Sequence, residues 1–156
     1  MEHSEAITEI LNDLVKINND RIEGYQKAIN ESKDLDIDLK AIFEGMIRES
    51  TQYKEELTEK IAHHGGEVED DTTSAGKIYR AWMDIKAAIT DSDRHSILAS
   101  CEFGEDAAQR AYEAALAPDS RLDADCREMV AAEKEALKKS HDLIKTQRDV
   151  HRSLQS

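Results

Sequence analysis

The sequence predicts an all-α protein, a four-helix bundle built from two αα-hairpins. Helix breakers are scarce, since six glycines and one proline occur in 156 residues, and both residue types are unfavourable inside helices. Four long segments also repeat apolar residues at the spacing of one helix face. With 39% hydrophobic residues and no break in composition, residues 1–156 are expected to form a single domain.

The helix boundaries follow from capping and breaking residues. Five helices are expected, at residues about 4–32, 37–64, 74–89, 93–117 and 123–151. Ser4 and Asp36 are candidate N-caps of the first two helices. Gly65 and Gly66 end the second helix, and Pro118 follows the fourth. These four boundaries therefore have a local cause in the sequence.

The one long connection lies between the second and fourth helices and carries the short helix at 74–89. Its apolar side contains Ile78, Trp82 and Ile89. A helix of this length covers roughly 24 Å, and the flanking residues add more, so the connection can run the full height of a bundle. A full-height crossover makes the second and fourth helices parallel, which is the arrangement of ferritin-like bundles.

Charge and composition narrow the classes of partner. The formal charge of −13, from 34 acidic and 21 basic residues, argues against nucleic acid or an anionic membrane surface as a partner. No apolar run approaches the ~20 residues of a transmembrane helix, and the N-terminus lacks the pattern of a signal peptide, so a cytoplasmic location is expected. Cys101 and Cys126 lack a CxxC spacing and are expected to be buried, reduced thiols.

Carboxylates interrupt the apolar stripes of three long helices, at Glu49, Glu105 and Glu133, whereas the first helix has Arg21 on its stripe. An unpaired buried charge is costly, so each carboxylate requires a proton, a cation or hydrogen-bond donors. Counting from the two inter-helix turns places all four residues near mid-height, within about one helical turn of a common level. The sequence therefore predicts a polar layer across the bundle. The acids beside Arg21, Asp20 among them, are expected on the solvated face.

Convergent carboxylates in a dry bundle are the donors used by di-iron and di-manganese centres. The candidate ligands for iron or manganese are Glu49, Gln52, Glu102, Glu105 and Glu133. Glu102 is an alternative to Glu105, and Gln52 offers only a neutral amide oxygen. The residues expected to surround such a site are Arg21, Tyr25, Tyr53 and Tyr112.

Two features depart from a di-metal pattern and favour a site without metal. The second and fifth helices lack the usual Glu-x-x-His spacing, since Gln52 and Ala136 occupy the histidine positions. Arg21 also stands where a fourth carboxylate is expected. In the alternative without metal, Arg21 forms a bidentate pair with Glu49, tyrosine hydroxyls hydrogen-bond the other carboxylates, and one carboxyl group stays protonated.

Histidines are not expected to supply the missing ligands. His141 lies eight residues after Glu133, about 12 Å further along the helix, which is too far for a shared metal. His63 and His64 are expected in the last turn of their helix, where an imidazole interacts favourably with the helix dipole.

Four segments resemble a known family. They are LVKINNDRIEGYQKAI, MIRESTQYKEEL, SAGKIYRAWMDIKAAI and SILASCEFGEDAAQRAYEAAL. They are similar, in the same order, to blocks of a bacterial domain-of-unknown-function family of ferritin-like four-helix-bundle proteins. The resemblance implies a ferritin-like bundle with a helical crossover in a bacterial, cytoplasmic setting. It implies no established activity.

The favoured function is a non-catalytic structural or stress-associated bundle, in which Arg21 and hydroxyl groups neutralise the buried glutamates. The alternative is a carboxylate-rich iron or manganese protein with oxidase or peroxide-handling activity, so the sequence leaves open whether the protein is an enzyme. Self-association through residues 78–89, giving a homo-oligomer, is compatible with either function, and no protein partner is identified.

Overall fold

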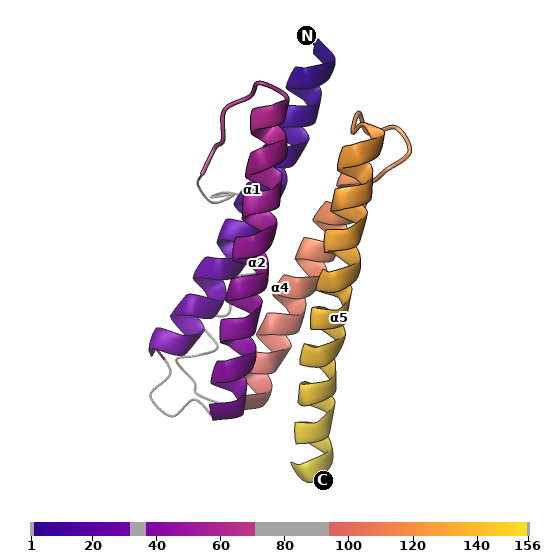
Figure 1. Cartoon of the computed structure of the whole chain (residues 1–156). Coiled ribbons are helices and arrows are strands. Elements are labelled where there is room, and N and C mark those ends of the chain that lie inside the picture. Colours follow the sequence, from indigo (N-terminus) through magenta and orange to yellow (C-terminus); the bar gives the residue numbers. More distant parts are fainter. Residues whose placement is uncertain (1, 32–36, 71–93, 156) are drawn as a thin grey trace.

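The computed structural model describes residues 2–31, 37–70 and 94–155. These residues form four helices (Figure 1): α1 (Glu2–Glu31), α2 (Ile37–His63), α4 (Arg94–Ala115) and α5 (Ala124–Gln155). No strand occurs in the described part of the chain. The all-α, four-helix prediction is therefore confirmed, while the predicted short helix at 74–89 lies outside the described residues.

The helix directions follow from side-chain contacts between the hairpins. Asn18 contacts Tyr112 and Arg21 contacts Glu105, so α1 and α4 are antiparallel. In the same way, α5 runs antiparallel to α2, because Glu49 accepts a hydrogen bond from Ser140 while His64, directly after the end of α2, lies beside the start of α5. Consequently α2 and α4 run in the same direction, and α2 ends at the opposite end of the bundle from the start of α4 (Figure 1).

Local capping residues set the described helix ends. The amide N–H groups of Gly65 and Gly66 donate to the carbonyls of Ala62 and Ile61, both at 3.0 Å. Together with the positive φ of 75° at Gly65, these bonds form the Schellman ending that glycine favours. At the start of α5, Asp123 Oδ1 accepts the Cys126 amide proton at 2.8 Å, as an N-cap does.

The start of α1 differs from the prediction. The helix begins at Glu2, so Ser4, the expected N-cap, lies inside the first turn. At the other end of the chain α5 extends to Gln155, four residues past the predicted end.

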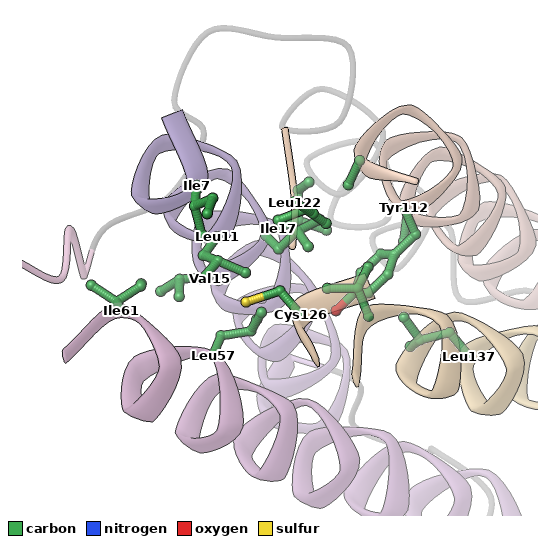
Figure 2. Close-up of a cluster of buried hydrophobic side chains, with 14 residues drawn as sticks. Ile7, Leu11, Val15, Ile17, Leu57, Ile61, Tyr112, Leu122, Cys126 and Leu137 are labelled. Carbon is green, nitrogen blue, oxygen red and sulfur yellow. The ribbon is translucent and has the colours of Figure 1, made fainter. Parts of the chain in front are cut away.

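The apolar core consists of two clusters. One cluster fills the end of the bundle where α2 ends and α5 begins, and Figure 2 shows it. Its buried members are Ile7, Leu11, Leu14, Val15, Ile17, Leu57, Ile61, Ala108, Tyr112, Ala115, Leu122, Cys126, Val130 and Leu137. The second fills the other end and comprises Tyr25, Ala28, Leu39, Phe43, Met46, Ile97, Leu98, Cys101 and Ile144. On every helix the charged or hydroxyl-bearing residues Arg21, Ser50, Glu105 and Ser140 lie between the two clusters in sequence, so a polar layer separates them.

Both cysteines are free and buried, as predicted. Among the described helices, none combines the length and the hydropathy that a membrane span requires.

Candidate functional site

Arg21 is the centre of the polar layer and is fully buried. Its Nε donates to Glu105 Oε1 at 2.7 Å, and its Nη2 lies 2.9 Å from Glu49 Oε1. Its Nη1 donates to Ser50 Oγ at 2.8 Å and to the Met46 carbonyl at 3.3 Å. The guanidinium therefore bridges two carboxylates from different helices. The predicted bidentate pair with Glu49 alone is wrong, because the fork divides its donors between α4 and α2.

Glu105 is the most enclosed partner of this guanidinium. The Tyr25 hydroxyl donates to the same Oε1 atom at 2.6 Å, while Oε2 has no hydrogen-bond partner. Burial and the Glu105 charge raise the pKa of Tyr25 well above its usual value, so the phenol remains a neutral donor. Burial lowers the pKa of Arg21, but the surrounding groups, Glu105 first and then Tyr25 and Glu49, together outweigh this, and the net shift is upward. Arg21 is therefore a permanent cation in the layer.

Glu49 closes the layer at its rim, since 22% of its side chain is exposed. Ser140 Oγ donates to Oε1 at 2.8 Å, and the Tyr53 hydroxyl donates to Oε2 at 3.2 Å. Burial, followed by the Glu49 charge, raises the pKa of Tyr53. Glu49 thus links three helices through Arg21, Ser140 and its own helix α2.

Glu133 lies apart from the guanidinium and is 1% exposed. Its Oε1 accepts a hydrogen bond from the Tyr112 hydroxyl at 2.8 Å, and Asn18 in turn donates to that hydroxyl at 2.9 Å. Its Oε2 has no hydrogen-bond partner, and the described residues give it no ion pair. Burial raises the pKa of Glu133 to about 9; the Tyr112 hydrogen bond opposes this shift and the Glu56 carboxylate adds to it. Glu133 is therefore a neutral carboxylic acid at pH 7.

Two of the proposed ligands lie outside the layer. Gln52 is exposed and donates to Glu56 Oε2, one turn along the same helix, at 3.2 Å. Glu102 is near the surface between α4 and α5, where it contacts Arg148 and lies 3.9 Å from His141 Nε2. Neither side chain meets Glu49, Glu105 or Glu133 in the interior.

Other polar residues took positions that differ from the prediction. Asp20 is 2% exposed, so the solvated position predicted for it is wrong. Ser50 and Asn18 are buried parts of the network that sequence reasoning missed. Their positions gave a signal, because Ser50 lies four residues after the apolar Met46 and Asn18 lies three residues before Arg21, each pair on one helix face.

A second, mixed group of polar side chains lies at the end of the bundle where α2 ends and α5 begins. His64 Nε2 lies 3.1 Å from Asp123 Oδ2 and 3.8 Å from Cys126 Sγ. A third group near the surface comprises Glu102, Asp106 and His141, in which His141 Nε2 lies 2.7 Å from Asp106 Oδ1. The prediction that His64 only meets the helix dipole did not anticipate the first of these groups.

The helices and their interior define an all-α, four-helix-bundle protein with an arginine-centred ionic layer. The family model described as a domain of unknown function, DUF2383, matches residues 6–118. The chain therefore belongs to this family. No curated protein and no solved structure matches it.

The family match covers three of the four helices in the layer. It includes Arg21, Glu49 and Glu105, which form the bridged ion pair. It ends before α5, which supplies Glu133 and Ser140.

Proposed function

We propose that this protein is a non-catalytic bundle of the ferritin-like type, in which the ionic layer has a structural role. The observation that carries the proposal is the placement of Arg21. Its guanidinium lies between Glu49 and Glu105 and provides, from within the chain, the positive charge that a metal ion would otherwise provide.

The donor set does not fit a di-metal centre. Glu49 and Glu105 each direct an oxygen to the guanidinium, and Gln52 and Glu102 lie outside the layer. A divalent ion placed among these carboxylates would meet the fixed positive charge of Arg21 in a medium of low dielectric constant, where repulsion is strong.

A structural role agrees with the energetics of buried ion pairs. Such a pair adds little net stability compared with apolar residues, but breaking one side of it is costly. Here Arg21 joins α1 to α2 and α4, so sliding any of these helices by one turn separates a charge from its partner. The layer therefore fixes the relative register of three helices, a role for which polar core residues are known.

The ferritin-like assignment is supported by helix direction. Since α2 and α4 are parallel, as are α1 and α5, the two hairpins are joined in the way that a single long crossover produces.

Iron or manganese binding is the second candidate function, and one observation favours it. Glu105 Oε2 and Glu133 Oε2 are both buried without a hydrogen-bond partner, and buried carboxylate oxygens without donors are uncommon. With Glu49, these two residues would be the ligands.

Anaerobic titration of the chelator-treated protein with ferrous iron, and separately with manganese, tests the proposal. We expect that the polar layer binds neither metal. The wild type, Glu49→Ala and Glu105→Gln should therefore give the same binding isotherm. A defined stoichiometry that Glu49→Ala abolishes would replace the structural proposal with the metal-binding one. Gln52→Ala, a change on the exposed face of the same helix, is the matched control.

A further inference from the structure

A second site lies where α2 ends and α5 begins, and it uses a different set of donors. The imidazole of His64, the carboxylate of Asp123 and the thiol of Cys126 each offer one donor atom, and these atoms lie within 4.8 Å of one another. The side chain of His64 is 15% exposed and that of Asp123 is 37% exposed, whereas Cys126 is fully buried. The group therefore has an inner sulfur and an open outer side.

The backbone holds all three donors in place. Gly65, in the left-handed conformation, ends α2 directly after His64. Gly66 packs so closely on α1 that an added Cβ would lie 2.5 Å from Thr8 Cγ2. The second segment is fixed by the N-cap, in which Asp123 uses Oδ1 to accept the Cys126 amide proton and keeps Oδ2 for His64.

We propose that His64, Asp123 and Cys126 form a binding site for one divalent metal ion of the zinc class. Imidazole nitrogen, thiolate sulfur and carboxylate oxygen are the donors that zinc uses. Ordinary zinc bond lengths in a tetrahedron place nitrogen about 3.4 Å from oxygen and about 3.6 Å from sulfur. The observed separations of 3.1 and 3.8 Å require shifts of only a few tenths of an ångström.

Binding exchanges a proton for the metal. The ion forms a bond to Cys126 Sγ, the S–H bond breaks, and the proton leaves to solvent. Since His64 uses its Nε2 lone pair, the ring proton resides on Nδ1. Three protein donors leave the fourth position for water or a small ligand, as in zinc sites that remain open.

An acidic cleft borders this site at His64. The cleft has a volume of about 600 Å³ and is lined by His64 together with Glu5, Glu9, Glu67 and Glu69. Carboxylates along a cleft raise the local concentration of cations. On the inner side, Figure 2 shows the Cys126 sulfur among aliphatic side chains such as Leu57, which belong to the same apolar cluster and limit access of water.

The group of Glu102, Asp106 and His141 provides a comparison. It has three possible donors as well, but no thiol, and Arg148 already contacts Glu102. A spectroscopic signal from a metal thiolate therefore distinguishes the two groups, and Cys101, buried in the other apolar cluster, provides a matched thiol elsewhere in the core.

Anaerobic cobalt titration of the full-length, reduced and chelator-treated protein tests the proposal, with zinc as the competing ion. We expect one cobalt per chain, with a thiolate-to-cobalt charge-transfer band in the near ultraviolet and the intense visible bands of tetrahedral cobalt. Cys126→Ser removes the charge-transfer band. His64→Gln and Asp123→Asn each weaken binding by more than about tenfold, since even the outer partners of metal ligands have effects of this size.

Asp123→Asn is informative because asparagine caps a helix as well as aspartate does, so weaker binding by this variant reflects the lost charged donor. Cys101→Ser and His141→Gln are the controls and are expected to bind cobalt like the wild type. If Cys126→Ser does not fold, His64→Gln, at a partly exposed position, carries the test.

The proposal is overturned if the wild type binds neither cobalt nor zinc, or if the charge-transfer band survives Cys126→Ser. It is also overturned if the metal is lost on His141→Gln and retained on His64→Gln. This metal site is separate from the structural role proposed for the interior layer. The two tests are also independent, because the iron titration reports on Glu49 and Glu105, whereas the cobalt charge-transfer band reports on Cys126.

Discussion

Glu105 and Glu133 are both buried glutamates in the same bundle, yet they meet opposite electrostatic surroundings. Glu105 is paired with Arg21 at 2.7 Å and also accepts a hydrogen bond from Tyr25. Glu133 has Tyr112 as its hydrogen-bond donor and no basic partner among the described residues, and its pKa rises to about 9. One guanidinium therefore separates a region where a buried glutamate has a cationic partner from a region where a buried glutamate has none.

The contrast shows that burial alone does not decide the state of a core glutamate. Removing a carboxylate from water favours its protonated form, and a cation in contact reverses that preference. In this bundle the tyrosines donate hydrogen bonds in both regions, so the difference lies with Arg21. Changes that remove the cation or remove the titratable group test this explanation directly.

The largest effect is expected from Arg21→Met. The substitution keeps the apolar length of the side chain but leaves Glu105 buried without a counter-charge, which is expected to reduce the free energy of unfolding by about 3–5 kcal/mol. Urea denaturation at pH 7 measures the loss. Adding Glu105→Gln to Arg21→Met removes the unpaired charge and is expected to restore part of the stability. If Arg21→Met alone is as stable as the wild type, Glu105 does not need the cation.

Glu133→Gln is expected to stabilise the protein at neutral pH. The pKa of Glu133 in the folded protein, about 9, lies above the ordinary 4.5. Below pH 4.5 the carboxyl group is protonated in both the folded and the unfolded state, so its contribution to the stability of the folded state is fully present there. Its contribution is lost as the pH rises toward 9, by about 1.4 kcal/mol per pH unit. At pH 7 the substitution is therefore expected to raise the free energy of unfolding by roughly 1–3 kcal/mol.

The measurement is urea denaturation at several pH values between 5 and 9, a range set by the raised pKa of Glu133. The wild type should lose stability across this range more steeply than Glu133→Gln. Glu135→Gln, an exposed change two residues away, should keep the wild-type slope. Equal slopes in the wild type and Glu133→Gln would mean that Glu133 is ionised in the folded protein.

The smallest effect is expected at the rim of the layer. Tyr53→Phe removes the 3.2 Å hydrogen bond to Glu49, and because Glu49 is partly solvated, the expected loss is about 0.5–1.5 kcal/mol. The adjacent, exposed Gln52→Ala should change stability by less than about 0.5 kcal/mol. Thermal denaturation of both variants beside the wild type measures the difference. A larger loss for Gln52→Ala than for Tyr53→Phe would contradict the placement of these two side chains.

Sequence reasoning identified most of the layer because the signal is local. Arg21, Glu105 and Glu133 each interrupt an apolar stripe of period 3.6, and the structure buries all three. Counting residues from the turns placed Arg21, Glu49 and Glu105 together correctly. The common level predicted for Glu133 is wrong, because Ser140 is the α5 residue in the layer and Glu133 lies seven residues away, between Val130 and Leu137 of the first apolar cluster.

The same reasoning failed where the outcome depended on packing between helices. Gln52 lies three residues from Glu49, yet it faces solvent, because Glu49 itself lies at the rim of the layer and Gln52 lies further round the helix from the core. Glu102 and His141 come from two different helices, α4 and α5, and lie close together near the surface. No spacing within one helix gives such a pair.

The amino-acid sequence by itself determined the four long helices, their glycine and aspartate caps at the α2–α5 end, and the identity of the polar residues on the buried faces, because these depend on interactions between residues close in the chain. The tertiary structure alone decided that Arg21 divides its donors between Glu105 and Glu49, that Glu133 has no cation, and that His64 meets Asp123 and Cys126. Partner choice among buried charges depends on distances of a few ångströms between helices, and these distances are set only when the side chains pack.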